Sequence, residues 1–132
     1  MSQGNVEIVR SGYETVNRTA QPVVEALHPE VEWHTAADLP DAGVHRGVDG
    51  VGRLVSEWFG SFEDFRADIE EIIDGGDEIV VVVLRLHGRV KGSSDTVELH
   101  ETHVWRLRDG KAIEIREYRT KAQALDAAGL SE

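Results

Sequence analysis

The residues best suited to chemistry lie in one stretch, 96–119, which reads as two alternating runs joined by Asp109-Gly110. An Asp-Gly pair between alternating runs is typical of a β-hairpin. On one face of that hairpin the residues near the turn are apolar, whereas those farther away are ionisable: Glu101, His103, Glu117 and Arg119. A face graded in this way favours a sheet whose closed end is core and whose open end lines a pocket.

His103 is the predicted acid–base residue, because an imidazole exchanges protons near physiological pH. Glu101 and Glu117 are its predicted partners. Arg119 is the predicted contact for an oxyanion or carboxylate of a substrate, and Trp33 and Trp105 are the predicted apolar walls. The alternatives stay open: a hydrogen-bonded core histidine, glutamates neutralised by Arg119 or Arg85 in a structural cluster, an arginine at the rim, and tryptophans that only build the core.

The register of the hairpin decides which side chains meet. A two-residue turn sets Trp105 opposite Glu114, whereas a three-residue loop sets it opposite Ile113. We prefer the second register, because it pairs apolar with apolar residues. It places Glu101 opposite Glu117, so that ionising both carboxyl groups is costly and one glutamate is expected to keep its proton near neutral pH.

The sequence predicts no metal and no cofactor. His100 and His103 are three residues apart on a strand, so their side chains point to opposite faces and share a metal poorly. Gly43, Gly47, Gly50 and Gly52 do not form a phosphate-binding loop. His87 is a further candidate substrate contact. It shares one side of its strand with Arg85 and Arg89, and whether that side faces the pocket or the exterior stays open.

Length and composition predict a single domain, residues 1–132. The absence of cysteine excludes disulfides and thiol chemistry. A net charge of −11 disfavours nucleic acid and anionic membranes as partners. Residues 1–5 carry no secretory pattern, and the longest aliphatic run, 79–84, is too short to span a bilayer, so we expect a cytoplasmic protein.

The periodicity of apolar residues predicts helices at 6–18, 20–27, 51–60 and from 120 to 129, with Asn5, Thr19 and Thr120 as caps. It predicts strands at 31–35, 65–73 and 78–91 besides the hairpin, with a bulge or bend at 70–73 and a loop at 36–46. Helices separate from a run of strands indicate an α+β fold.

The sequence resembles the SnoaL-like and ketosteroid-isomerase-like members of the nuclear transport factor 2-like superfamily. The resemblance rests on residues 13–17, 31–34, 43–47, 103–111 and 116–118. It implies a cone-shaped, strongly bent antiparallel sheet wrapped around the N-terminal helices, with a pocket at the open end and commonly a homodimer. In polyketide cyclases of this fold a histidine and an acid similar in place to His103 and Glu117 do acid–base work.

Two positions depart from the steroid isomerase pattern. The acid–base aspartate of that enzyme falls at or next to Thr35, and its oxyanion tyrosine falls near Gly12, one residue from Tyr13. Tyr13 and Thr35 are therefore predicted substrate contacts, but authentic steroid isomerase activity is not expected.

These observations predict a pocket protein for a small-molecule ligand. The leading hypothesis is a cofactor-independent isomerase, cyclase or dehydratase that moves protons on a small apolar carbonyl compound. The competing hypothesis is a ligand-binding or accessory module without turnover. We also expect a homodimer that pairs through the outer face of the hairpin, with Val104 and Tyr118 near its centre and Arg106 and Arg116 at or near the contact.

Overall fold

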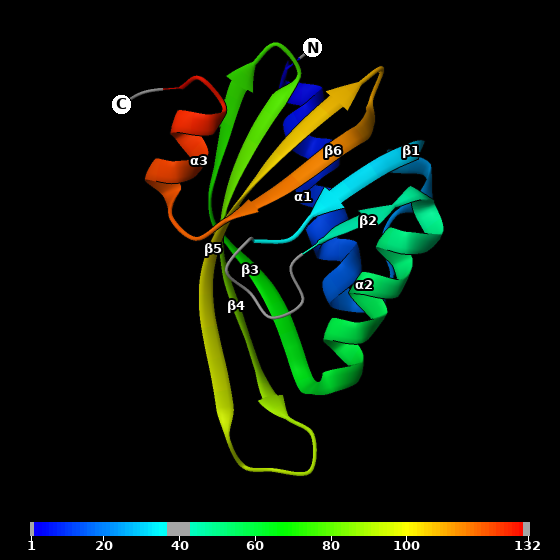
Figure 1. The fold of residues 1–132 in the computed structure, drawn as a ribbon, viewed down its shortest axis with the longest axis vertical. Helices are drawn as coiled ribbons and strands as arrows, with labels where there is room; N and C mark the ends of the chain where they lie inside the picture. The colour runs from blue at the N-terminus through cyan, green and yellow to red at the C-terminus, as the bar shows by residue number, and fades with distance from the viewer. Residues whose placement is uncertain (1, 37–42, 131–132) are drawn as a thin grey trace.

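The computed structural model of this chain describes residues 2–36 and 43–130 (Figure 1). The helices are α1 (Ser2–Thr19), the short 3₁₀ helix η1 (Val24–Ala26), α2 (Gly47–Ser61) and α3 (Lys121–Ala127). The strands are β1 (Leu27–His34), β2 (Val44–Arg46), β3 (Phe62–Gly76), β4 (Ile79–Val90), β5 (Thr96–Arg108) and β6 (Lys111–Tyr118).

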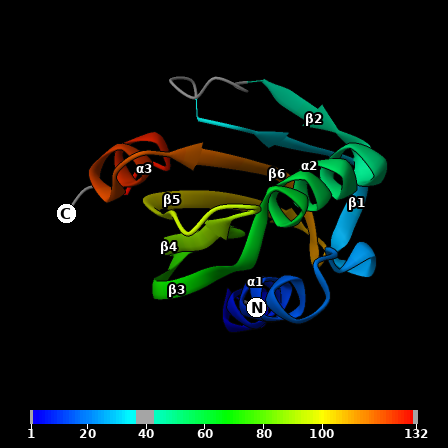
Figure 2. The ribbon, with the colours of Figure 1, turned by 90° about the horizontal axis from the view of Figure 1, so that it is seen from below.

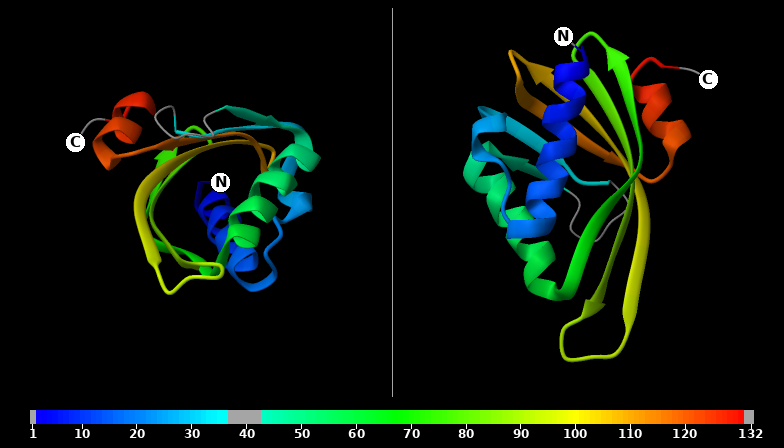
Figure 3. Two further views of the ribbon diagram at one scale, coloured as in Figure 1. Left: turned by 60° about the horizontal axis from the view of Figure 1, so that its bottom comes forward. Right: turned by 180° about the vertical axis from the view of Figure 1, so that it is seen from behind.

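One strongly curved sheet holds all six strands in the order β2-β1-β6-β5-β4-β3. Neighbouring strands run antiparallel except β1 and β6, which are parallel, so the sheet is mixed and open between its edge strands β2 and β3. The sheet wraps around α1, with α2 beside it on the concave side, while α3 lies on the convex side (Figures 2 and 3). The expected α+β cone fold is confirmed.

The concave face of the sheet is the core. Val80, Val82 and Leu84 alternate along β4 and are completely buried against the two long helices. From α1 and α2, Val9 and Leu54 pack into the same cluster. Each such side chain contributes roughly 1.5–3 kcal/mol relative to an exposed one, so this layer holds α1 at a fixed distance from β5.

The hairpin of β5 and β6 has a register that differs from both predicted ones. Asp109 and Gly110 have φ angles of 52° and 79°, and this left-handed pair closes a two-residue turn between Arg108 and Lys111. An irregularity after Arg106 then shifts the strands, so that Trp105 lies opposite Ile115.

The predicted three-residue loop, the pairing of Trp105 with Ile113 and that of Glu101 with Glu117 are therefore wrong. Glu117 lies opposite His103 instead. The alternation of faces survives, because the true pairing differs from the preferred one by two residues.

Of the local features predicted from the sequence, some are confirmed and others are wrong. The bulge expected at 70–73 is confirmed by a register shift between Ile69 and Glu71. The cap of the last helix is also confirmed, since the Thr120 side chain accepts a hydrogen bond from the backbone N–H of Gln123 at 3.1 Å. Asn5, in contrast, lies inside α1 and does not cap it.

The predicted helix at 20–27 is wrong. Only residues 24–26 are helical, in a single 3₁₀ turn, because the parallel pairing of β1 with β6 already takes Leu27 into the sheet beside Ala112. The predicted loop at 36–46 is partly a strand: residues 44–46 form β2, which pairs with β1. The remainder of that loop, 37–42, lies outside the described residues.

The outer, convex face of the sheet is covered in part by α3. Val81 and Val104 pack there against Ala124 and Leu125. Val104 is only 2% exposed, so its predicted place at the centre of a dimer contact is wrong. The homodimer itself stays a prediction. No helix within residues 2–36 and 43–130 is both long and apolar enough to cross a bilayer.

Candidate functional site

Tyr13 of α1 reaches across the core to the hairpin. Its hydroxyl oxygen lies 2.7 Å from Nδ1 of His103 and accepts a hydrogen bond of 2.8 Å from Nε1 of Trp105. Burial raises the pKa of Tyr13 well above its ordinary value of 10.0, because it penalises the phenolate. The hydroxyl therefore keeps its proton and has it available for His103.

His103 and Glu101 form a buried pair on the same face of β5. Nε2 of His103 lies 3.0 Å from Oε1 of Glu101. A carboxylate oxygen accepts a hydrogen bond, so this geometry assigns the imidazole proton to Nε2 and leaves Nδ1 to accept the Tyr13 proton. The bonds run in one direction, from Trp105 through Tyr13 and His103 to Glu101.

Glu117 stands opposite His103 and is held from two sides. Its Oε2 accepts the indole N–H of Trp33 at 2.7 Å, and its Oε1 accepts the backbone N–H of Ala36 at 3.1 Å. Burial raises the pKa of Glu117 and the neighbouring Glu101 adds to the rise, while His103 and both hydrogen bonds oppose it. The carboxyl group thus retains a proton to higher pH than an exposed glutamate does.

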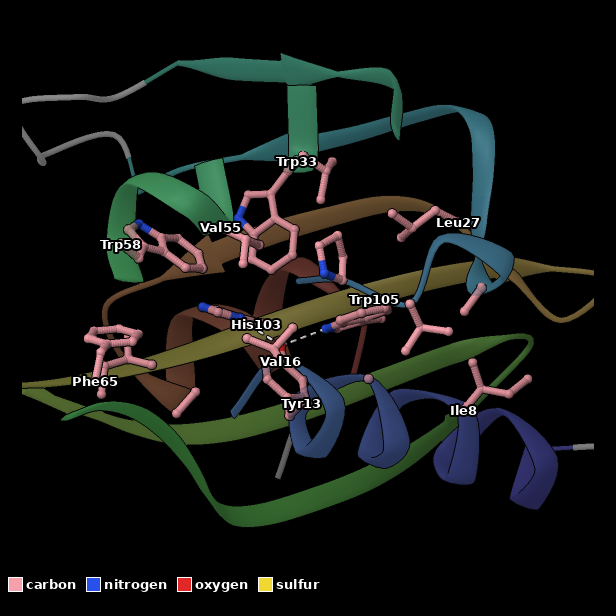
Figure 4. A pocket seen from close by; sticks show the side chains of 17 residues that line it. Ile8, Tyr13, Val16, Leu27, Trp33, Val55, Trp58, Phe65, His103 and Trp105 are labelled. Carbon is pink, nitrogen blue, oxygen red and sulfur yellow. Dashed lines mark hydrogen bonds between the residues drawn. The ribbon is translucent and has the colours of Figure 1, made fainter. Parts of the chain in front are cut away.

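Two chambers adjoin this cluster. The first, which we call the apolar chamber, has a volume of about 40 Å³ and runs along α1 past Tyr13, His103 and Trp105 (Figure 4). The second, the acidic chamber, has a volume of about 110 Å³ and is lined by Glu101, Glu117 and Thr35 on its polar side. Both chambers share the side chains of Trp58, Phe65 and Leu86.

The structure brings together most of the predicted site. Glu101, His103 and Glu117 lie within one buried cluster, with Trp33 and Trp105 as walls and as donors to it. Sequence reasoning missed Phe62 and Phe65, which border the acidic chamber. The signal for them was slight, because aromatic residues at the start of a strand are usual core residues.

Three of the predicted substrate contacts lie at the edge of the site. Thr35 borders the acidic chamber, but its hydroxyl exchanges hydrogen bonds with the backbone of Gly43 at 3.2 and 2.8 Å. His87 also borders that chamber, while its Nε2 lies 2.6 Å from Asp68. Arg119 lines an open groove beside Glu117 and neither chamber.

Arg85 does not neutralise the buried acids. It pairs with Glu98 at 2.9 Å and with Asp68 at 3.6 Å on the convex face of the sheet. The alternative in which Arg85 neutralises Glu101 or Glu117 is therefore wrong.

Two groups among the described residues could hold a metal ion: Glu101, His103 and Glu117 inside, and Glu32, His34 and Glu114 on the convex face. In each group one potential ligand atom per residue lies within 4.8 Å of the others. In the inner group, the two nitrogens of His103 and both oxygens of Glu117 already take part in hydrogen bonds. An ion there would have to displace them, so the donor set fits proton transfer better than ligation.

A comparison with known protein families identifies the family to which this chain belongs. The model of the SnoaL-like domain matches residues 9–115. The chain belongs to the SnoaL-like family. Among curated proteins none matches it significantly. As a member of this family, the chain has a scaffold suited to binding small molecules.

Solved structures share the fold of this SnoaL-like chain. Bal32a, from a soil-derived mobile gene cassette, is 23% identical over 96% of both chains with a TM-score of 0.79. An NTF2-like protein from Burkholderia thailandensis E264 is 26% identical over 92% of this chain and 96% of its own, with a TM-score of 0.76. A candidate SnoaL-like polyketide cyclase from Jannaschia sp. CCS1 is 23% identical, with 96% and 91% covered and a TM-score of 0.74.

Proposed function

We propose that this SnoaL-like protein is a cofactor-independent enzyme that moves protons on a small, mainly apolar carbonyl compound, in an isomerase, cyclase or dehydratase reaction. The observation that carries the proposal is the buried chain from Tyr13 through His103 to Glu101, which ends beside Glu117 at a cavity. Such a cluster is expensive to bury and gives acid and base groups different proton affinities. The resemblance in fold to a candidate polyketide cyclase supports the same class of reaction.

The Glu101–His103 pair is the proposed base. Oε1 of Glu101 is engaged by His103, whereas Oε2 accepts no hydrogen bond from the described residues and belongs to a side chain that lines the acidic chamber. Oε2 takes a proton from the carbon next to the substrate carbonyl. His103 holds the carboxylate in place through its Nε2–H, and Tyr13 in turn fixes the imidazole through Nδ1.

Glu117 is the proposed acid. Its raised pKa keeps a proton available, and one of its carboxyl oxygens lies within 4.8 Å of an oxygen of Glu101. As the carbon loses its proton to Glu101, the electron pair moves to the carbonyl oxygen, which takes the proton of Glu117. Return of the proton at another carbon gives an isomer, and attack of the enol carbon on a second carbonyl gives a ring.

A panel of small carbonyl compounds tests the proposal by deuterium exchange at the carbon next to the carbonyl, followed by NMR in heavy water. We expect exchange with the wild type and a loss of about 10²–10⁴-fold in His103→Gln and in Glu101→Gln. His100→Gln is the matched control, because His100 lies on the same strand but is exposed on the convex face. Exchange at the wild-type rate in His103→Gln would contradict the proposal.

A ligand-binding module is the second candidate. The observation that favours it is Thr35, whose hydroxyl is engaged with Gly43 where the resemblance to isomerases would place an acid–base carboxylate. This candidate predicts that compounds of the same panel raise the melting temperature of the wild type and of His103→Gln alike, while neither protein catalyses exchange or forms product.

A further inference from the structure

The acidic chamber combines aromatic and acidic walls. Trp58, Phe62 and Phe65 line it together with Glu101 and Glu117. The three rings form one cluster, with centroids 5.5 Å apart for Phe62 and Phe65 and 6.4 Å apart for Trp58 and Phe65. Trp58 and Phe65 close the end of the apolar chamber opposite Ile8 (Figure 4), so the aromatic cluster stands between the two cavities.

The basic side chain that borders this chamber among the described residues is that of His87, and its Nε2 is engaged by Asp68 at 2.6 Å. No lysine or arginine lines the chamber, and no ion pair joins an arginine or lysine of the described chain to Glu101 or Glu117. Arg85 and Arg89 are engaged with acids on the convex side. With its one imidazole proton on Nε2, His103 is neutral, so the carboxylate of Glu101 has no cationic partner and a negative charge remains in a buried place.

We propose that the acidic chamber takes the ammonium group of its ligand, so that the substrates of this protein are small carbonyl compounds that also carry an amine or quaternary ammonium group on an apolar body. The proposal rests on the proposed function, since it names the substrate class of the same site. An organic cation is attracted both by aromatic ring faces and by carboxylates. It balances the charge that the cluster leaves uncompensated.

The alternatives in ligand charge fit less well. An anionic ligand would place its charge beside the carboxylate of Glu101, and no arginine lines the chamber to meet it. A neutral ligand leaves the carboxylate of Glu101 without a cationic partner.

The size of the chamber restricts the head group. Its volume of about 110 Å³ is smaller than that of an apolar cavity of about 150 Å³ that holds benzene. A trimethylammonium head fits this scale, and the aromatic cluster replaces the water around its methyl groups. Choline is therefore a suitable probe.

Three probes of one shape isolate the charge: choline, 3,3-dimethylbutan-1-ol and 3,3-dimethylbutanoate. Calorimetric titration near pH 7 should show choline binding at least about tenfold more tightly than the neutral alcohol, with no measurable binding of the carboxylate. Equal or tighter binding of the alcohol, or binding of the carboxylate, would overturn the inference.

Two variants locate the preference. Phe62→Leu keeps an apolar wall but removes a ring face, and should reduce the preference for choline over the alcohol by about two- to thirty-fold. Phe59→Leu is the matched control, because Phe59 packs on Phe65 with centroids 5.0 Å apart but does not line the chamber. Equal effects of Phe62→Leu and Phe59→Leu would count against the chamber as the site.

The two proposals fail in different ways. If uncharged carbonyl compounds undergo exchange that depends on His103 while choline does not bind, the enzyme proposal stands and the ammonium inference falls. If choline is preferred but no compound undergoes exchange, the ammonium site stands and the enzyme proposal falls.

Discussion

Strand β5 carries two histidine–glutamate pairs of nearly the same geometry on its two faces. On the concave face the nitrogen of His103 lies 3.0 Å from Glu101, and the two side chains are 1% and 2% exposed. On the convex face His100 lies 3.1 Å from Glu98, and the exposures are 57% and 49%. Water screens the His100–Glu98 pair, so this pair contributes little to stability. The His103–Glu101 pair is shielded from water, and only its hydrogen bonds compensate for the cost of burying it.

The pKa values of two glutamates near these pairs are shifted in opposite directions. On the convex face, Arg85 first and His100 second hold the pKa of Glu98 below its ordinary value. On the concave face, burial raises the pKa of Glu117. The strands β5 and β6 thus carry an ionised glutamate on the solvent side and a glutamate that retains its proton on the core side. The side of the sheet, more than the spacing in the sequence, determines the direction of the pKa shift.

The largest expected difference follows from removing the acid of each pair. Glu101→Ala leaves the Nε2–H of His103 buried without an acceptor and should lower the free energy of unfolding by about 3–5 kcal/mol. Glu98→Ala, the matched control, should leave it unchanged within error, because both partners meet water. Urea denaturation followed by circular dichroism measures both. Similar losses in the two variants would mean that burial does not separate the pairs.

A smaller effect is expected from the tyrosines. Tyr13→Phe removes one hydroxyl and leaves two buried groups, the indole N–H of Trp105 and Nδ1 of His103, without their partner. The free energy of unfolding should fall by about 1–3 kcal/mol. Tyr118→Phe removes a hydroxyl at the edge of the convex face and should have a lesser effect. Urea denaturation measures both variants, and a larger loss of unfolding free energy in Tyr118→Phe than in Tyr13→Phe would contradict this prediction.

The pH dependence of stability should have opposite signs on the two faces. The native state keeps the proton of Glu117 above the ordinary pKa of 4.5, whereas the unfolded chain has lost it. The Glu117 contribution therefore lowers stability progressively as pH rises from about 4.5 through the raised pKa. Glu117→Gln should remove that fall.

Asp68 provides the contrast on the convex face. Its hydrogen bond to His87, with a smaller one to Arg66, lowers its pKa below 3.8, although burial opposes this. Its contribution is present above the unfolded pKa and is lost as pH falls through the lowered one. Asp68→Asn should therefore flatten the acid limb only. Thermal melts from pH 3 to 8 test both variants, and a fall at high pH that survives Glu117→Gln would contradict the assignment.

The smallest effect concerns the exposed part of the convex face, where we expect the homodimer contact near Arg106, Arg116 and Tyr118. Arg116→Glu reverses a charge there and should weaken self-association about tenfold. Arg53→Glu changes the net charge equally from the exposed side of α2 and is the control. Sedimentation velocity at micromolar concentration measures it. A wild type that stays monomeric as salt is raised would remove the dimer.

Much of this molecule is determined locally, and those features could be predicted from the sequence. Alternation along 96–119 placed Glu101, His103 and Glu117 on one face, because successive residues of any strand point to opposite sides. Thr120 was predicted as a cap because the spacing to Gln123 is itself the geometry of the bond. The order of helices and strands sufficed for the α+β class.

Partnerships between distant residues needed the tertiary structure. The meeting of Tyr13 with His103 joins residues 90 positions apart, and its existence depends on how closely the curved sheet holds α1. The register depended on a two-residue turn followed by an irregularity, so His103 and not Glu101 faces Glu117. Val104 has the same alternation as its exposed neighbours, and only the packing of α3 buries it. Local periodicity fixes the direction of a side chain, whereas its partner depends on the chain that closes over it.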